Sequence, residues 1–252
     1  METESESRRT FKVCSFNIRN GDADDGPNSW PHRADTVVRL LQQIDADIFG
    51  LQEVLEAQLD SILDGMPEYA SIGVGRIDGA VEGEFAPILF RTDRLKLVDY
   101  GWFWISETPE IPNSKSWETA CERICTWCDF TFKGNSFRAM NTHLDHISEE
   151  ARLEGAKLLL SRTNDLPTVI MGDFNALPEE APVQAIRSSG FLDSLEGKSK
   201  STFHNWGTED NGQIDYIFFR DLGLDWSWVI EEQQNGRDAS DHYPVVATVR
   251  LG

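Results

Sequence analysis

The sequence predicts an α+β fold, and three observations support this. Runs of alternating or continuous apolar residues, typical of strands, recur along the chain. Segments with helical periodicity separate some of these runs, whereas other runs follow one another directly. No change of composition, linker or internal repeat divides the 252 residues. We therefore predict one domain over residues 10–252, preceded by a charged, disordered lead-in at residues 1–9.

In the first part of the chain, strands and helices alternate. Residues 11–18 alternate between apolar and polar side chains, as a strand with one buried face does. Residues 33–43 carry a broad apolar face, which predicts a helix. On the same grounds we expect strands at 48–54, 69–75, 85–91 and 95–105, and a helix at 54–63.

The second part of the chain begins with two consecutive strands. Residues 123–133 and 136–143 predict a hairpin, because Lys133-Gly134-Asn135-Ser136 between them is typical of a turn. The clearest helix spans residues 149–165, with leucines on one face and Glu/Arg pairs on the other. We further expect strands at 168–172, 214–219 and 245–250, and a helix at 181–188. The loops at 21–32, 76–84, 106–122 and 200–213 carry no recognisable motif.

The chain is strongly acidic, with a formal net charge of −20 and no run of Lys or Arg. Proteins that bind long nucleic-acid backbones usually present a basic face, so the charge favours a small substrate over long DNA or RNA. Only seven residues are Lys, and an acidic, lysine-poor surface also suits a salt-rich cytoplasm. In molar salt, screening would make the charge uninformative about the substrate. Both interpretations stay open.

The sequence also bears on location and on metal binding by thiols. No apolar run reaches the ~20 residues of a membrane-spanning helix, and the charged start lacks the apolar segment of a secretory signal. We expect a soluble, cytoplasmic monomer. Cys121, Cys125 and Cys128 cluster, but structural zinc needs four ligands and Cys14 is distant. We interpret Cys125 and Cys128 as small apolar residues of a strand.

Polar side chains occur where one predicted strand after another meets a loop. Any one of them has an ordinary explanation as a turn former, a cap or a surface residue. Their recurrence at six strand ends is harder to explain that way, because sites on sheet scaffolds gather at such ends. The residues concerned are Asn17, Glu53, His143 with Asp145, Asp173 with Asn175, Asp215, and Asp241 with His242.

Six motifs that contain these residues occur in order and resemble the endonuclease/exonuclease/phosphatase superfamily. They are Ser15-Phe16-Asn17-Ile18-Arg19, Leu51-Gln52-Glu53-Val54, Asn141-Thr142-His143-Leu144-Asp145, Gly172-Asp173-Phe174-Asn175, Ile214-Asp215-Tyr216-Ile217 and Ser240-Asp241-His242-Tyr243-Pro244. The resemblance covers nearly the whole chain and is closest to the small uncharacterised metal-dependent hydrolases of this group. It implies a four-layer α/β sandwich, with two mixed β-sheets packed face to face, helices outside and the site at one end.

The resemblance implies a metal site made of oxygen ligands. Asn17, Glu53 and Asp241 would bind Mg²⁺ or Mn²⁺, which prefer carboxylate and carbonyl oxygens. The metal would polarise a phosphoryl oxygen and stabilise charge on the leaving group.

Five residues would carry the catalytic roles. By the resemblance, Asp173 would orient or deprotonate the attacking water, and Asn175 would bind a phosphate oxygen or the water. His242 would donate to the phosphate while Asp215 holds its other ring nitrogen. His143 would either contact the phosphate or protonate the leaving oxygen.

Arg123 and Asp145 are further candidates for substrate binding. Arg123 would either donate to phosphate or form a structural salt bridge. We interpret His146 and His204 as surface or loop residues, and the pair Trp102 and Trp104 as core packing.

The sequence thus predicts a Mg²⁺- or Mn²⁺-dependent phosphoester hydrolase, a phosphodiesterase or phosphatase that uses in-line attack by water. One alternative is a nuclease acting on the ends of DNA or RNA. Another is a non-catalytic module that binds a phospho-ligand, but such a module would be expected to lack a principal residue, and none is missing.

Overall fold

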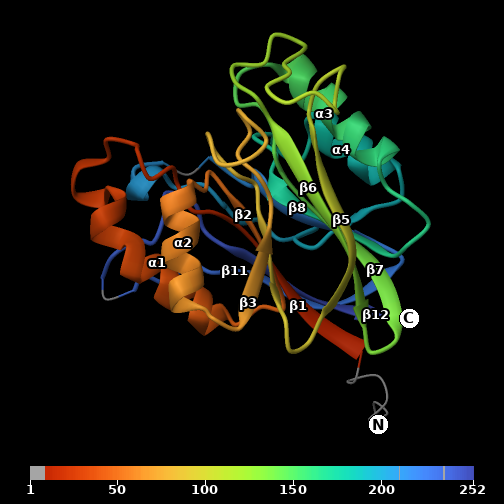
Figure 1. The fold of residues 1–252 in the computed structure, drawn as a ribbon, viewed down its shortest axis with the longest axis horizontal. Coiled ribbons are helices and arrows are strands. Elements are labelled where there is room, and N and C mark those ends of the chain that lie inside the picture. Colours follow the sequence, from red (N-terminus) through yellow and green to blue (C-terminus); the bar gives the residue numbers. More distant parts are fainter. Residues whose placement is uncertain (1–8, 210, 235) are drawn as a thin grey trace.

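The computed structural model describes residues 9–209, 211–234 and 236–252 (Figure 1). The predicted disordered lead-in at residues 1–9 lies outside this range except for Arg9, whose guanidinium donates to the carbonyl of Gly252 at 2.8 Å. Within the described part of the chain, no helix is long and apolar enough to cross a membrane.

Two mixed six-stranded sheets form the centre of the molecule. The first contains β1 (Thr10–Asn17), β2 (Ile48–Gln52), β3 (Tyr69–Ile72), β4 (Ile88–Arg91), β11 (Leu222–Val229) and β12 (Val245–Leu251), in the order β11-β12-β1-β2-β4-β3. The second contains β5 (Lys96–Trp104), β6 (Ile124–Phe132), β7 (Asn135–His143), β8 (Thr168–Asp173), β9 (Leu192–Asp193) and β10 (Asp215–Arg220), in the order β5-β6-β7-β8-β10-β9.

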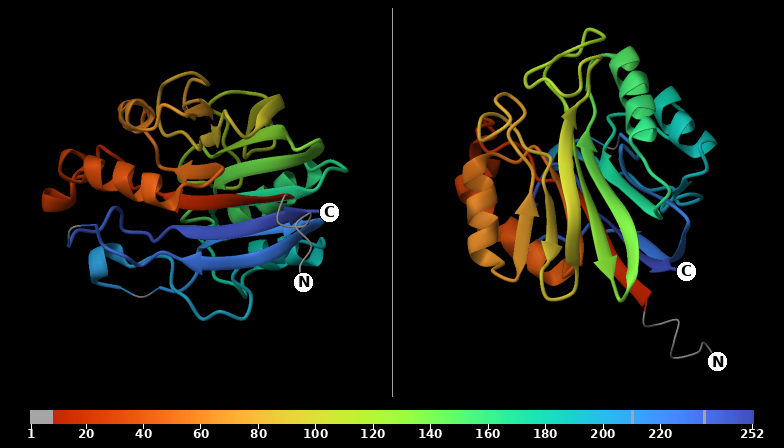
Figure 2. Two further views of the ribbon diagram at one scale, coloured as in Figure 1. Left: turned by 90° about the horizontal axis from the view of Figure 1, so that it is seen from below. Right: turned by 45° about the vertical axis from the view of Figure 1, so that its right-hand side comes forward.

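Helices cover the outer face of each sheet. The helices are α1 (Trp30–Ile44), α2 (Glu56–Gly65), α3 (Glu149–Ser161) and α4 (Ala181–Ser188). Figures 1 and 2 show α1 and α2 on one side of the sheets and α3 and α4 on the other. The predicted four-layer sandwich is therefore confirmed.

Apolar side chains fill the three spaces between these layers. Phe11 of the first sheet stacks on Phe137 of the second, with ring centroids 4.3 Å apart, in the core between the sheets. A second core joins α1 and α2 to the first sheet, and a third joins α3 and α4 to the second. Cys125 belongs to the third core and Cys128 to the first, so the two thiols face opposite sides of β6 and serve as small apolar residues.

A buried amide connects the two sheets. The Asn141 side chain on β7 donates to the carbonyls of Leu51 at 2.8 Å and Pro87 at 2.9 Å, and accepts from Gln52 Nε2 at 2.7 Å. Gly50 on β2 leaves room for it, because a Cβ there would lie 2.7 Å from Asn141 Oδ1. This contact fixes the ends of β2 and β7 relative to each other.

The sheet topology gathers the predicted polar strand ends at one end of the sandwich. β1 and β2 are parallel, with Asn17 beside Gln52, and β7 and β8 are parallel, with His143 beside Asp173. β10 is antiparallel to β8 and places Asp215 opposite Asp173. Because β12 is antiparallel to β1, the residues just before β12 also reach this end.

The sequence prediction missed two strands and misplaced some boundaries. β11 is an edge strand with a bulge near Trp226, and its Trp226 and Trp228 are exposed whereas Ser227 is buried. This reverses the usual alternation of polar and apolar faces. β9 has only two residues. Helix α1 begins at Trp30, whereas we predicted a start at residue 33. Helix α3 ends at Ser161, whereas we predicted an end at residue 165.

Candidate active site

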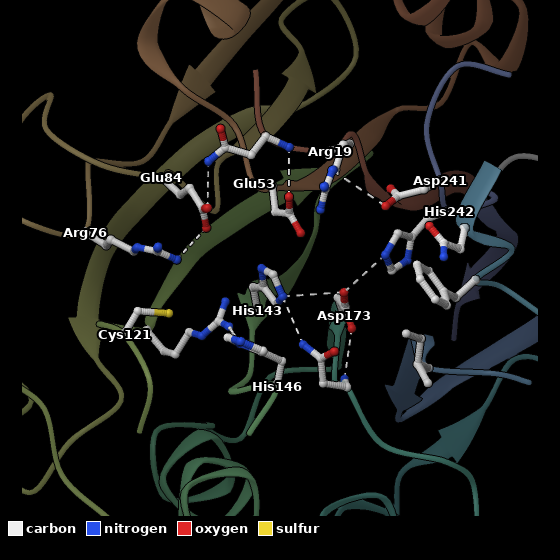
Figure 3. A pocket seen from close by; sticks show the side chains of 16 residues that line it. Arg19, Glu53, Arg76, Glu84, Cys121, His143, His146, Asp173, Asp241 and His242 are labelled. Carbon is white, nitrogen blue, oxygen red and sulfur yellow. Dashed lines mark hydrogen bonds and ion pairs between the residues drawn. The ribbon is translucent and has the colours of Figure 1, made fainter. Parts of the chain in front are cut away.

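A pocket of about 440 Å³ opens at the end of the sandwich where the polar strand ends meet. Figure 3 shows its side chains pointing toward one another from both sheets. Of the predicted site residues, it is lined by Glu53, Arg123, His143, Asp173, Asn175, Asp241 and His242. Asn17 and Asp215 are fully buried and lie behind this lining.

Asp173 lies at the bottom of the pocket between two imidazoles. Its Oδ2 is 3.5 Å from His143 Nε2 and 3.8 Å from His242 Nε2. The other nitrogen of His242, Nδ1, lies 2.9 Å from Oδ2 of Asp215. The predicted pairing of Asp215 with His242 is thus present, and it leaves Nε2 of His242 facing the pocket.

The two imidazoles are in opposite electrostatic environments. Burial alone would lower the pKa of His242, but the charge and hydrogen bond of Asp215, together with Asp173, raise it to about 10. Burial lowers the pKa of His143 well below its ordinary value, and the charges of Arg123 and Arg76 add to this. At neutral pH, His242 is therefore an imidazolium and His143 is a neutral imidazole.

Asp173 has the properties of a proton acceptor. Burial, followed by the charge of Asp215, raises its pKa to about 7. Asn17 donates to its Oδ2 at 3.0 Å, and the backbone N–H of Asn175 donates to its Oδ1 at 2.9 Å. The carboxylate is thus held in place and close to the pKa that suits a general base at neutral pH.

Hydrogen bonds define the tautomer of His143. Nδ2 of Asn175 donates to the carbonyl of Leu144 at 3.1 Å and lies 3.0 Å from His143 Nε2. An amide nitrogen only donates, so Nε2 accepts and the ring proton is on Nδ1. Nδ1 has no hydrogen-bond partner among the described residues. His143 is therefore arranged to donate from Nδ1 and not to deliver a proton from Nε2.

Asn17 and Glu53 form one unit at the ends of β1 and β2. The Asn17 amide nitrogen donates to Glu53 Oε1 at 3.0 Å, and the backbone N–H of Asn20 donates to Glu53 Oε2 at 2.8 Å. Burial raises the pKa of Glu53, but these hydrogen bonds and the charge of His242 hold it below the ordinary value. Glu53 is in the left-handed region, with φ 61°, as are Arg19 and Asn175. Such backbone strain often accumulates at functional sites.

The residues present fit a divalent cation between Glu53 and Asp241. Arg19 lies between these two carboxylates in Figure 3, with its Nε 3.7 Å from Asp241 Oδ2. Hydrogen bonds to Asp25, and the charges of Asp241 and Glu53, raise the pKa of Arg19. Positive charge is therefore favoured at this point, and all the donor atoms are oxygens, which suit Mg²⁺ or Mn²⁺. In its observed contacts Asn17 orients Glu53 and Asp173; direct contact with a metal stays a prediction.

Two other groups of potential metal ligands are less suitable. Asp173, Asp215 and His242 lie within ligand distance of one another, but the His242 imidazolium already supplies the positive charge there. Cys121, Asp145 and His146 form the second group. Its Asp145 is ion-paired with Arg123 at 3.7 Å, and Arg123 also contacts Nδ1 of His146 at 2.9 Å. Arg123 is buried at this position and repels a cation, whereas Arg19 is one-third exposed and already bonded to Asp25, toward which it can move.

The weaker sequence candidates have mixed positions. Arg123 forms the structural ion pair with Asp145 and also lines the pocket, where its donation to a phosphate stays a prediction. Asp145 accepts from the backbone of Ala120, Ile147 and Ser148 and is not part of the pocket lining. Its role in substrate binding stays a prediction.

The outer histidines and the tryptophan pair are also placed by the structure. His146 is exposed at the pocket rim. His204 lies in a loop, one of the two positions predicted for it, but it is buried there and stacks on Tyr243 with ring centroids 4.0 Å apart. Trp104 is buried and Trp102 packs against its cluster, as predicted.

Sequence reasoning missed about half of the pocket lining. The missed residues are Arg19, Asn20, Arg76, Glu84, Cys121, Phe203, Asn205 and Ile214. Arg19 ends the first motif, Asn20 follows it and Ile214 begins the fifth motif, so the motifs gave a usable signal for these three residues. Arg76, Glu84, Cys121, Phe203 and Asn205 lie in or beside loops without periodicity, where no signal was available.

Comparisons with known proteins agree with this geometry. The sequence matches the model of the Endonuclease/Exonuclease/phosphatase family over residues 14–242. An endonuclease/exonuclease/phosphatase of Bacteroides vulgatus is 33% identical, with a TM-score of 0.92, over 96% of this chain and 99% of that one. A mannosyl-6-phosphatase of Bacteroides thetaiotaomicron is also 33% identical, with a TM-score of 0.87, over 96% of this chain and 100% of that one.

A more distant structure shares the fold alone. The catalytic domain of human Nocturnin, solved with a bound sulfate anion, is 18% identical, with a TM-score of 0.76, over 97% of this chain and 94% of that one. No protein of curated function gives a significant match.

Proposed function

Because the chain belongs to the Endonuclease/Exonuclease/phosphatase family, we propose that it is a Mg²⁺- or Mn²⁺-dependent hydrolase of small phosphoesters. The observation that carries this proposal is the position of Asp173, a buried carboxylate with a raised pKa between a charged and a neutral imidazole. Such a group accepts a proton from water while cationic neighbours bind the phosphate.

Each side chain has a separate role in the in-line attack by water. Asp173 orients the water and takes its proton, and the backbone of Asn175 and the side chain of Asn17 keep the carboxylate in position. The Nε2–H of His242 donates to a phosphoryl oxygen, and Asp215 maintains the charge and orientation of the ring. The neutral ring of His143 lines the pocket on the other side of Asp173, with Nε2 held by Asn175.

Glu53 and Asp241 would hold the divalent cation, and Asn17 would orient Glu53. When bound, the cation supplies charge neutralisation for the phosphoryl group and the leaving oxygen. Arg19 shares this position and would shift toward Asp25, with which it already forms two hydrogen bonds of 2.9 and 3.0 Å.

A small substrate suits this pocket better than a long nucleic acid. The pocket volume of about 440 Å³ is that of a small-molecule site. The net charge of −20 opposes binding of extended phosphate backbones. The similarity to a mannosyl-6-phosphatase supports the same choice. Hydrolysis of DNA or RNA ends is the alternative, because the same residues would serve it.

A substrate panel tests this function. Purified protein with Mg²⁺ or Mn²⁺ should hydrolyse p-nitrophenyl phosphate, its bis-ester or a hexose 6-phosphate faster than a single-stranded oligonucleotide, and EDTA should abolish the activity. Asp173→Asn should lower kcat/KM by about 10²–10⁴-fold, the usual contribution of a general base. Asp165→Asn, at an exposed position in a loop, is the matched control. Inactivity across the panel with several metals would overturn the proposal.

A further inference from the structure

The pocket has a second end, opposite His242, that the catalytic roles leave unused. Arg76, Glu84 and Arg123 line it, and Figure 3 shows Arg76 and Glu84 on the far side of His143 from His242. Resting on the proposed function, we propose that this end binds the leaving group and that it selects a leaving group rich in hydroxyls, so that the substrate is a phosphoester of a sugar or polyol.

Glu84 is held with its carboxylate toward the pocket. It accepts a hydrogen bond from Asn20 Nδ2 at 2.8 Å and pairs with the guanidinium of Arg76. Each carboxylate oxygen thus has one donor, and each has a further lone pair for a hydroxyl. Both side chains are only about 15% exposed, so hydrogen bonds to a ligand here would be shielded from water.

Hydrogen bonds hold the loop between β3 and β4, which carries both residues, in place. The backbone N–H of Arg76 donates to the carbonyl of Glu84 at 3.1 Å, which closes the loop. The indole of buried Trp104 donates to the carbonyl of Arg76 at 2.6 Å. The pair is therefore presented by a preorganised loop, which reduces the entropic cost of binding a specific ligand.

This end of the pocket holds unsatisfied donors. Nε of Arg76 and both Nε and Nη1 of Arg123 are buried and have no hydrogen-bond partner in the described part of the chain. Arg123 is only 4% exposed. These nitrogens are closed to solvent and do not themselves reach a ligand; both guanidinium groups thus form a fixed wall of this end of the pocket.

The charges at this end favour hydroxyls over a second anion. Arg76 is neutralised by Glu84, and Arg123 is ion-paired with Asp145 at 3.7 Å. A second phosphate would meet the carboxylate of Glu84, whereas a hydroxyl donates to a carboxylate and accepts from a guanidinium at once. Paired carboxylate and guanidinium groups are therefore suited to neighbouring hydroxyls.

The position relative to the reaction centre is that of a leaving group. Arg76, Glu84, Arg123 and His143 line this end of the main pocket, and a side recess of about 10 Å³, room for about one water, opens beside them. His143 contacts the catalytic Asp173 on one side and faces this recess on the other. An ester whose phosphorus lies near Asp173 and His242 thus places its alcohol portion toward Arg76 and Glu84.

The test compares two substrates that differ in hydroxyls but not in ring size. Mannose 6-phosphate and cyclohexylmethyl phosphate present the same phosphomethyl group on a six-membered ring. Wild-type kcat/KM should favour the sugar by at least about 10²-fold, because sites built for hydroxyls reject analogues that lack them. Glu84→Gln should lower this ratio at least tenfold, and Arg76→Ala should lower it also. Glu82→Gln, exposed on the same loop, should leave the ratio unchanged.

Each alternative result has a definite meaning. Equal kcat/KM for the two esters in the wild type, or an unchanged ratio in folded Glu84→Gln protein, would overturn this inference while leaving the hydrolase function intact. Preference for a sugar bisphosphate over the monophosphate would replace the hydroxyl site with an anion site. If p-nitrophenyl phosphate and both esters are inert, the proposed function fails, and the inference fails with it.

Discussion

The two pocket imidazoles show how neighbouring charges set the function of a residue type. Both rings are buried, and burial alone favours the neutral form. His242 has Asp215 and Asp173 beside it and is charged, whereas His143 has Arg76 and Arg123 nearby and is neutral. The carboxylate of Asp173 between them thus has a cation on one side and a neutral ring on the other.

Proton NMR of the histidines in the EDTA-treated protein should show these two states directly. From pH 6 to 8, His143 should remain neutral and His242 protonated, with a midpoint for His242 near 10. Asp215→Asn removes the main cause of the raised pKa and should move this midpoint down by more than one pH unit. A His242 that titrates near 6.5 in the wild type would contradict the assignment.

The same pKa shift has a consequence for stability. Because the folded-state pKa of His242 is raised from 6.5 to about 10, ionised His242 stabilises the fold. This contribution is complete below pH 6.5 and is lost as the pH rises toward 10. Urea unfolding should therefore show that Asp215→Asn destabilises the protein more at pH 6 than at pH 10. An equal or reversed difference would mean that the pair does not act through the charge of His242.

Residues of the catalytic end could be predicted from sequence because each is a polar group at the end of an apolar strand. Asp173 and His242 are examples, each next to a buried apolar run. Arg76 and Glu84 could not be found this way. They meet only because their loop folds back on itself, and neither loop composition nor spacing specifies that contact.

At the level of elements, the position of the site depends on how β2 and β7 are joined. Asn141 satisfies the carbonyls of Leu51 and Pro87 in the space between the sheets. Glu53 follows β2 and His143 ends β7, so this amide, together with the hydrogen bond from Asn17 to Asp173, links the two halves of the pocket.

Asn141→Ala should lower the free energy of unfolding by on the order of 3 kcal/mol, because it removes three buried hydrogen bonds, two to the carbonyls of Leu51 and Pro87 and one from the Gln52 amide. Urea denaturation measures this change. Ser136→Ala, at an exposed position on the same strand, is the control and should change stability by less than about 0.5 kcal/mol. If Asn141→Ala lowers the free energy of unfolding no more than the control does, the amide does not join the sheets.

The helices and strands differ in how clearly their sequences predict them. α1 is strongly amphipathic, and β8 is a continuous buried run, so both were predicted. β11 was missed because its exposed face carries Trp226 and Trp228, whereas Ser227 is buried against the second sheet, where its hydroxyl donates to the carbonyl of Ser194. Tertiary contacts, not local pattern, define this edge strand.

At the scale of the whole molecule, the acidic charge is the feature that the fold does not explain. A net charge of −20 repels itself across a compact protein of this size, and salt screens such repulsion. The free energy of unfolding should therefore rise between dilute buffer and molar KCl, as measured by thermal or urea unfolding. A decrease with KCl would rule out adaptation to a salt-rich cytoplasm as the origin of the acidic surface.

The layered architecture was accessible from sequence through the order of the motifs, because the resemblance they carry specifies a whole fold. The individual side-chain contacts could not be predicted from sequence, because they depend on distances between segments far apart in the chain. Asn17 and Asp173 are 156 residues apart and yet form a hydrogen bond of 3.0 Å. Glu53, Asp241 and Asp173 line the same pocket, where we propose that the two acidic groups Glu53 and Asp241 hold a divalent cation beside Asp173 as the base.

The most direct test of this claim is the Mg²⁺ dependence of phosphoester hydrolysis in the wild type, in Glu53→Gln and in the control Glu56→Gln, exposed at the start of α2. We predict that EDTA abolishes wild-type activity and that Mg²⁺ restores it. Glu53→Gln should need at least tenfold more Mg²⁺ for half-maximal activity, and Glu56→Gln should behave as the wild type. Hydrolysis that persists in EDTA, or a Glu53→Gln protein with unchanged Mg²⁺ dependence, would contradict the account.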